Sequence, residues 1–147
     1  MLIRPARADD VGELVSCYEW LFAPPGVKPH DWDPERASGR LRDTVGLDGA
    51  EALLAEVDES IAGFCTIYHD INSVRFGRRA WVEDLAVDPD QRSQGIGKAL
   101  LDAAKAWARE RGATHLELDS AEARADAHRF YEREGAGYRS ICFGWEL

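Results

Sequence analysis

The segment that follows Ala80 constrains the fold more than any other part of this chain. Trp81–Val87 has the alternating apolar character of a β-strand, and Asp88-Pro89-Asp90 breaks it. From about Gln94 to Arg111, apolar residues recur at the spacing of one helix face. The segment therefore predicts a strand, a tight turn and a helix that opens on two glycines.

These two glycines, Gly95 and Gly97, predict a phosphate site at the helix start. Amides in the first turn of a helix lack intrahelical partners, and the helix dipole favours an anion there. Glycine lets a phosphate approach the backbone closely, and Arg92 and Lys98 add positive charge. A Walker A loop requires Gly at position 92 and Ser or Thr at position 99, where this chain has Arg92 and Ala99. The dinucleotide-binding fingerprint requires a third Gly at position 100, where this chain has Leu100.

The rest of the chain alternates strand and helix patterns and predicts one α+β domain over residues 1–147, with a mixed sheet and helices on both faces. The strand that ends at Val87 and the strand near His115 should be parallel, because the helix from Gln94 crosses between them. The other expected elements are strands at Ile3–Pro5, Ala52–Val57, Ile61–His69, His115–Asp119 and Ser140–Glu146, helices at Val11–Phe22, Pro34–Val45 and Ala123–Tyr131, and a polar loop at Asp70–Arg79.

Composition excludes several classes of protein. The 147 residues carry 18 Lys plus Arg against 27 Asp plus Glu, a net charge of −9, which argues against nucleic acid as a partner. No apolar run reaches the length of a membrane span, and the first residues lack a signal-peptide pattern, so we expect a cytoplasmic protein that does not bind membranes. The odd number of cysteines (Cys17, Cys65 and Cys142) predicts free thiols, and no His or Cys spacing predicts a metal site.

Two motifs together resemble the GNAT superfamily of N-acetyltransferases. The first is Arg92-x-x-Gly95-x-Gly97 after a strand, and the second is the stretch from Ala127 through Phe130-Tyr131 to Gly135. The resemblance covers nearly the whole chain. It implies a mostly antiparallel central sheet and acetyl-CoA as co-substrate, with no metal. The residues it implies as cofactor contacts are Leu85, Ala86 and Val87, whose backbone would hold the pantetheine arm, and Arg92, Ser93, Gln94, Gly95, Ile96, Gly97 and Lys98 around the pyrophosphate.

The same resemblance implies an acetyl transfer to a primary amine of a small molecule or peptide by direct attack. An alkylammonium is less than about one part in a thousand neutral at pH 7, so a base helps. Glu83 is the expected base, although strand alternation and an implied β-bulge leave open whether Glu83 or Asp84 faces the substrate. Tyr131 is the expected acid that protonates the departing thiolate.

Some features depart from the family pattern or leave alternatives open. Arg124 stands where the family often has Asn, so its contact with CoA is open, and Ala136 replaces an aromatic residue. We expect the acceptor to be selected by the first helix, residues 26–49 and residues 70–79. The acids Asp31, Asp33, Asp70, Glu83 and Asp84 suit a cationic amine, whereas Arg75, Arg78 and Arg79 suit a carboxylate.

A non-catalytic acyl-CoA-binding or regulatory domain on the same fold is the alternative function. A further expectation concerns assembly: a homodimer would pair through the edge strand at Ser140–Leu147.

Overall fold

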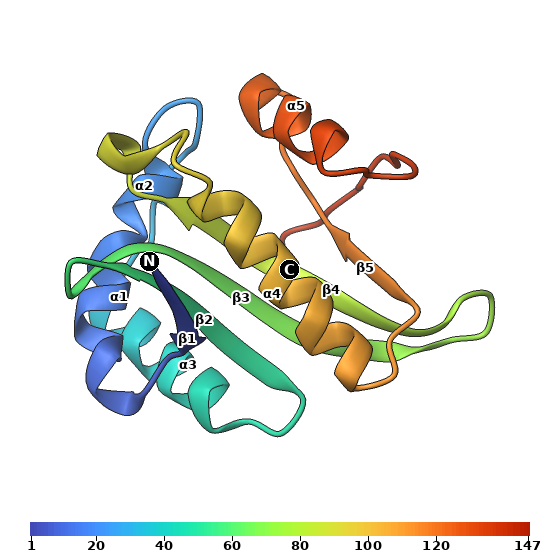
Figure 1. Cartoon of the computed structure of the whole chain (residues 1–147), viewed down its shortest axis with the longest axis horizontal. Helices are drawn as coiled ribbons and strands as arrows, with labels where there is room; N and C mark the ends of the chain where they lie inside the picture. Colours follow the sequence, from blue (N-terminus) through green and yellow to red (C-terminus); the bar gives the residue numbers. More distant parts are fainter.

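A five-stranded mixed sheet forms the centre of the molecule in a computed structural model that describes residues 1–147 (Figure 1). Its strands lie in the order β1-β2-β3-β4-β5, with all neighbours antiparallel except the parallel pair β4 and β5. The predicted fold class and the parallel pair are thus confirmed. The strands are β1 (Leu2–Pro5), β2 (Ala50–Val57), β3 (Ser60–Ser73), β4 (Gly77–Val87) and β5 (His115–Leu118).

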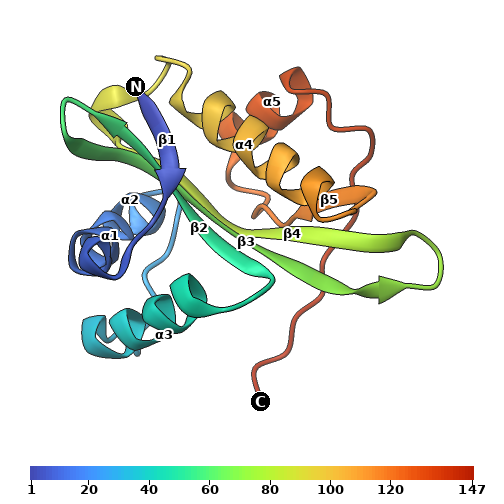
Figure 2. The same cartoon turned by 60° about the horizontal axis from the view of Figure 1, so that its bottom comes forward.

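Helices cover both faces of the sheet (Figure 2). One face carries α1 (Val11–Cys17), α2 (Glu19–Phe22) and α3 (Pro34–Gly46), and the other carries α4 (Ile96–Glu110) and α5 (Ala125–Arg133). Two short 3-10 turns, η1 (Ala8–Asp10) and η2 (Pro89–Gln91), precede α1 and α4. The helix expected from Val11 to Phe22 is therefore two short helices joined at Tyr18. No helix is both long and apolar enough to cross a bilayer.

Alternation along β3 divides the core into two apolar clusters. Phe64 packs with Leu14 and Leu54 beneath α1, whereas Cys65 and Ile67 pack with Leu100 beneath α4. The buried core thus fixes both helix layers on the sheet, and with them the ends of β4 and α4 that build the site described below.

The pairing between β4 and β5 stops well before β4 ends. The last pair is Val82 with Leu118, whereas β4 continues to Val87. The backbone of residues 83–87 consequently has no strand partner on its β5 side. This divergence leaves an opening between the two strands, on the side where α4 begins and α5 lies (Figure 1).

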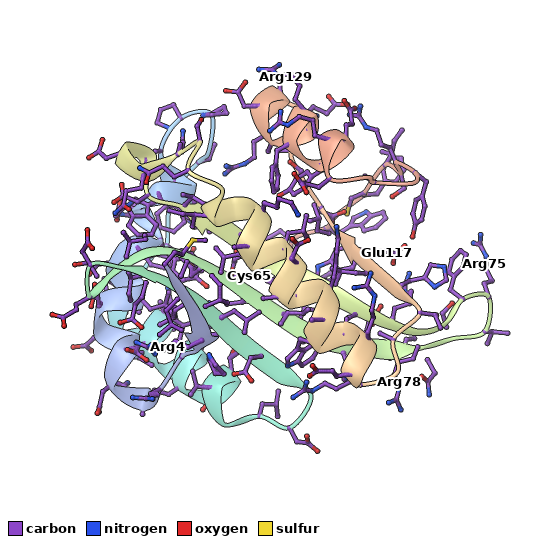
Figure 3. The ribbon with its side chains drawn as sticks, viewed as in Figure 1. Arg4, Cys65, Arg75, Arg78, Glu117 and Arg129 are labelled. Carbon is purple, nitrogen blue, oxygen red and sulfur yellow. The ribbon has the colours of Figure 1, made fainter.

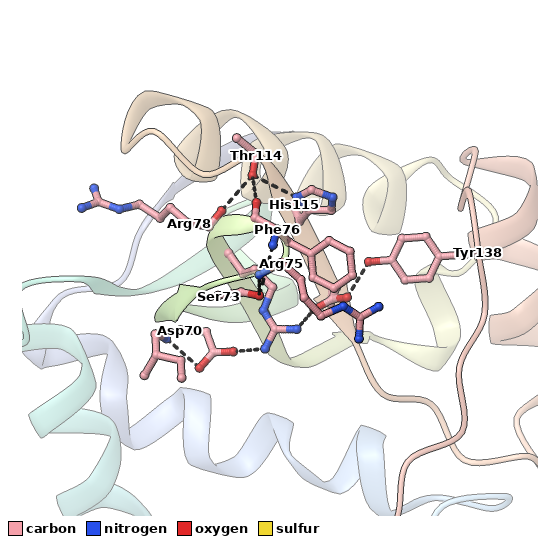
Figure 4. Close-up of polar contacts among 11 residues, drawn as sticks. Asp70, Ser73, Arg75, Phe76, Arg78, Thr114, His115 and Tyr138 are labelled. Atoms are coloured by element: carbon pink, nitrogen blue, oxygen red, sulfur yellow. Dashed lines mark hydrogen bonds and ion pairs between the residues drawn. The ribbon is translucent and has the colours of Figure 1, made fainter.

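The prediction of a polar loop at Asp70–Arg79 is wrong, because strands β3 and β4 extend into this segment and form a hairpin. Asn72 pairs with Arg78 and Ser73 with Gly77. The hydroxyl of Thr114 accounts for part of this order, since it donates to the carbonyls of Phe76 (2.7 Å) and Arg78 (3.2 Å) (Figure 4). These polar residues thus form strand through contacts with a segment distant in sequence.

The strand expected at Ser140–Glu146 is also absent. Residues 137–147 have no regular secondary structure and run away from the sheet (Figure 2). Every residue of this segment is exposed, including Phe143 at 75% and Trp145 at 80%. The alternating pattern is present, but no neighbouring strand supplies hydrogen bonds, and a strand requires such a partner.

Candidate active site

A cleft of about 930 Å³ lies at the opening between β4 and β5. Its volume is in the range of small-molecule and cofactor sites. Four parts of the chain line it: α2 with the turn after it, the end of β4, the turn into α4, and α5. Of the residues predicted to contact a cofactor, the cleft brings together Leu85, Ala86, Val87, Arg92, Ser93, Gly95, Ile96, Gly97, Lys98 and Arg124; Gln94 does not line it.

The start of α4 has the geometry that an anion site requires. Gly95 caps the helix at a φ of 82°, in the left-handed region where glycine is favoured. The carbonyl of Gly95 accepts from the amide of Ala99 at 3.0 Å, so the amides of residues 96–98 precede the first intrahelical bond. Their donors and the dipole of this 15-residue helix together favour an anion.

Gly97 keeps the floor of the cleft free of side chains. A Cβ at this position would lie 3.6 Å from Phe130 of α5 and 3.6 Å from Val87 of β4. Such contacts are ordinary for a methyl group, but any longer side chain would project between α4, α5 and β4. The glycine therefore leaves the space between these three elements to a ligand.

Positive charge gathers in the cleft although the chain is acidic. Arg92 and Arg133 line it without an ion pair, and the guanidinium of Arg124 donates to the carbonyl of Leu21 at 2.7 Å. Lys98 is less available, because its ammonium lies 2.5 Å from Asp102 and 3.5 Å from Glu134. Arg129, visible on α5 in Figure 3, is paired with Asp126.

Tyr131 reaches the same cleft from α5. Burial, followed by the neighbouring Cys65 thiol, raises the pKa of Tyr131 to about 12, while Arg124 opposes the shift. Its hydroxyl is therefore protonated at neutral pH and can donate a proton or a hydrogen bond. Cys65 lies on β3 (Figure 3), and burial raises the pKa of its thiol to about 12.

A β-bulge in β4 separates the two adjacent carboxylates. On β3, Thr66 lies opposite Asp84 and Ile67 lies opposite Val82, so Glu83 is the extra residue. Val82 packs with the cluster under α4, whereas Ala86 packs with the cluster under α1. The bulge thus moves the even-numbered side chains of β4 from one face of the sheet to the other.

Asp84 points into the protein, and one of its carboxylate oxygens is held by two hydroxyls. Its Oδ2 accepts hydrogen bonds from the hydroxyls of Tyr18 (2.8 Å) and Thr66 (3.1 Å). Burial raises the pKa of Asp84, and these two hydrogen bonds oppose that shift. A carboxylate with these partners is poorly placed to take a proton from an incoming amine.

Glu83 has the opposite environment, because its side chain is exposed. Loss of hydration on its protein-facing side raises the pKa of Glu83, and the Asp84 and Asp119 carboxylates raise it further. Tyr68 and Trp81 oppose the increase. Between the two carboxylates, Glu83 is therefore the one open to solvent, and neither of them is among the residues that line the cleft.

Most other charged residues considered for acceptor binding serve local structure. Asp33 caps α3 by accepting from the backbone amide of Arg36 at 2.8 Å, and Asp31 lies 3.4 Å from the guanidinium of Arg36. Asp70 pairs with Arg79, which also donates to Glu117 at 2.7 Å. Arg75 and Arg78 lie on the β3–β4 hairpin, at the end of the sheet remote from α5 (Figure 3).

Sequence reasoning missed several residues of this region. The sequence places Tyr18 only within the helix expected at Val11–Phe22, and Thr66 only within the strand expected at Ile61–His69. Tyr18 is separated from Asp84 by 66 positions in the sequence, and Thr66 is separated from it by 18 positions. No local sequence pattern therefore indicates these contacts. Phe130, which faces Gly97, was recognised only as part of the second motif.

The sequence also matches the acetyltransferase (GNAT) family over residues 14–138. The chain belongs to the GNAT acetyltransferase family. One relative in this family is the uncharacterised N-acetyltransferase YhdJ of Bacillus subtilis, which is 46% identical over 134 residues, covering 89% of this chain and 94% of the relative. The similarity to N-acetyltransferases supports acetyltransferase activity.

Solved structures of GNAT proteins share the fold. A ribosomal-protein-alanine N-acetyltransferase from Brucella melitensis superposes with a TM-score of 0.78 and 26% identity, covering 99% of this chain and 98% of that one. The aminoglycoside N-acetyltransferase AAC(6′)-Iy in complex with CoA gives a TM-score of 0.85 at 15% identity, covering 99% of this chain and 93% of that one. At that level of identity the second likeness concerns the fold alone.

Proposed function

We propose that this protein transfers an acetyl group from acetyl-CoA to a primary amine of a small molecule or peptide by direct attack. The observation that carries the proposal is the cleft itself, which combines the unpaired amides of the α4 start with the free backbone edge of β4. A pyrophosphate suits the first group of donors and an amide-bearing pantetheine arm suits the second. No cluster of His, Cys, Asp and Glu is arranged to hold a metal ion.

The pyrophosphate would lie over residues 95–98, with Arg92 as the nearest unpaired cation of the turn. The pantetheine arm would run along Leu85–Val87, adding hydrogen bonds in the manner of a strand. This arrangement directs the thioester toward the bulge at Glu83, because β4 connects the two points directly. Arg124 would close the cleft by joining α5 to the carbonyl of Leu21.

The chemistry then needs one base and one acid. Glu83 would take a proton from the ammonium of the acceptor, either directly or through water, and the neutral amine would attack the thioester carbonyl. As the C–S bond breaks, Tyr131 would protonate the departing thiolate, and the attacking nitrogen would lose its second proton to solvent, giving free CoA and the acetylated amine. Tyr131 would then recover its proton from solvent. A thiol has a pKa of about 8.5, so the help from Tyr131 is modest compared with that of the base.

A thiol-release assay with acetyl-CoA across amines, amino acids, aminoglycosides and peptide N-termini tests this function. The proposal expects release of free CoA with at least one class of amine and a matching acetylated product by mass spectrometry. Calorimetric binding of acetyl-CoA with no turnover for any acceptor would contradict the enzyme and favour the non-catalytic acyl-CoA-binding domain instead.

A further inference from the structure

The buried network around Asp84 lies directly behind the proposed base, and the mechanism above does not use it. Thr66 is the only polar residue among the 27 buried ones, which suggests a specific need for its hydroxyl. That hydroxyl makes two contacts with the same residue: it accepts from the amide of Asp84 at 3.1 Å and donates to the Asp84 carboxylate at 3.1 Å.

The first contact compensates for the bulge. An extra residue disrupts the strand ladder and leaves backbone groups without their usual partners. The Thr66 hydroxyl supplies an acceptor for the Asp84 amide immediately after the extra residue, Glu83. The bulge is thereby anchored from the neighbouring strand at the position where the chain changes face.

The second contact extends the anchor to the helical layer. The Tyr18 hydroxyl donates to the same Oδ2 at 2.8 Å. The ring of Tyr18 is itself held, since its centroid lies 4.8 Å from that of Phe64 and 5.7 Å from that of Trp32. Three separate elements therefore hold Asp84: β3, the α1–α2 junction and its own strand.

From this geometry we infer that Asp84 is a positioning residue, which acts with Thr66 and Tyr18 to fix the β4 bulge and so direct Glu83 toward the acceptor. The inference rests on the proposed function for its kinetic consequences. Without the bulge, strict alternation would place residue 84 on the α4 face and turn residue 83 inward on the α1 face. The network thus assigns the two adjacent carboxylates to different tasks.

The test is a double-mutant cycle between the network and the base. Thr66→Val keeps the branched shape and removes both contacts, and Tyr18→Phe keeps the ring packing. Each should lower kcat about tenfold in the native background, because misplacing a base by a fraction of an ångström is costly. In the Glu83→Gln background each should cause little further loss, while the KM for acetyl-CoA stays unchanged throughout. Equal losses in both backgrounds would overturn the inference.

Asp84→Asn separates positioning from base catalysis. Asparagine retains an oxygen that accepts from both hydroxyls, so kcat at the pH optimum should stay within about threefold. The acidic limb of the pH profile should move to lower pH, because Glu83 loses one of its carboxylate neighbours and retains only Asp119, with Tyr68 and Trp81 opposing. Loss of activity together with loss of that limb would identify Asp84 as the base and overturn the inference.

Two further measurements keep the result interpretable. Thr114→Val removes a hydroxyl that links β4 and β5 at the far end of the sheet, and it should leave kcat unchanged. If the wild-type protein releases no thiol with any amine, the proposed function fails, and NMR titration of the Glu83 carboxyl then tests positioning alone. The pKa of Glu83 should rise further in Thr66→Val, because loss of the bulge turns residue 83 inward and burial is the main cause of its raised pKa; an unchanged pKa would contradict the network's role.

Discussion

Glu83 and Asp84 are neighbours in sequence, yet the structure gives them different surroundings because one extra residue interrupts the ladder between β3 and β4. Asp84 is held by two hydroxyls, whereas Glu83 reaches solvent with a raised pKa. At the scale of single residues, this difference leaves Glu83 open to solvent and holds Asp84 inside the protein, as the proposed roles of the two carboxylates require.

Glu83→Gln should lower kcat/KM by about 10²- to 10⁴-fold, the range that a positioned general base contributes. A base acts in its deprotonated form, so the activity of the native protein should fall as the pH drops through the pKa of Glu83. Because that pKa is raised, the fall should begin at a higher pH than for an ordinary glutamate. Rate profiles from pH 4 to 9 check this. Glu35→Gln on α3 is the control and should match the wild type; an unchanged profile in Glu83→Gln would refute the assignment.

At the scale of elements, β1 is tied to its neighbours by Arg4. The guanidinium of Arg4 donates to both oxygens of Asp10, at 2.7 and 2.8 Å, and also pairs with Glu56 of β2. The hydrogen bond from Arg4 is the largest cause that lowers the pKa of Asp10, from 3.8 to about 2. The pair thus joins the edge strand to the entry of α1.

Asp10→Asn should therefore lower the free energy of unfolding by about 1 kcal/mol at neutral pH. A carboxyl whose pKa is lower in the folded state than in the unfolded state stabilises the fold at pH values above its unfolded-state pKa. That stabilisation is lost as the pH falls toward the folded-state pKa. The difference between variant and wild type should hence disappear between about pH 4 and pH 2 in urea titrations. A difference independent of pH would point to packing instead of the ion pair.

Gly63 determines how closely α4 approaches β3. A Cβ there would lie 3.0 Å from the Ala86 carbonyl oxygen, from Ile96 and from Leu100. Gly63→Ala should destabilise the fold by about 1–3 kcal/mol through overpacking, measured by denaturant unfolding. Gly39→Ala in α3 meets nothing within 4 Å and should stabilise by up to about 1 kcal/mol. Equal effects at the two positions would contradict the close approach.

These elements also show how far the sequence could predict the fold and the site. The turn from β4 into α4 was predictable because its signals, a breaker and two glycines, are local. The direction of Glu83 was not, since it depends on Thr66 and Tyr18, which are distant in sequence. The alternating pattern at Ser140–Glu146 predicted a strand, but a pattern specifies which side chains share a face and not whether a partner strand is available.

At the scale of the whole molecule, the free edge of β5 lies near a segment with exposed apolar side chains. Alternate residues of that segment, including Ile141, Phe143 and Trp145, are each at least 75% exposed. Exposed edges and apolar patches of this kind favour association. The homodimer expected through Ser140–Leu147 stays a prediction, and the edge strand through which it was expected to pair is not formed in the single chain.

Sedimentation velocity of the full chain and of a variant that ends at Gly137 tests the homodimer. The full chain should sediment as a dimer at micromolar concentrations, and the shortened variant as a folded monomer. Circular dichroism of the shortened variant verifies that it remains folded. A full chain that sediments as a monomer at all concentrations would refute the dimer.

Amide chemical shifts on titration with CoA provide the most direct test of the cofactor site on which the proposed function depends. We expect the largest ¹H–¹⁵N shifts at Gly95, Ile96, Gly97 and Lys98, with smaller ones along Leu85–Val87 and at Tyr131. The amides of the β3–β4 hairpin should not move. Saturable binding that shifts other amides and leaves residues 95–98 unchanged would contradict the account, and so would no binding at millimolar CoA.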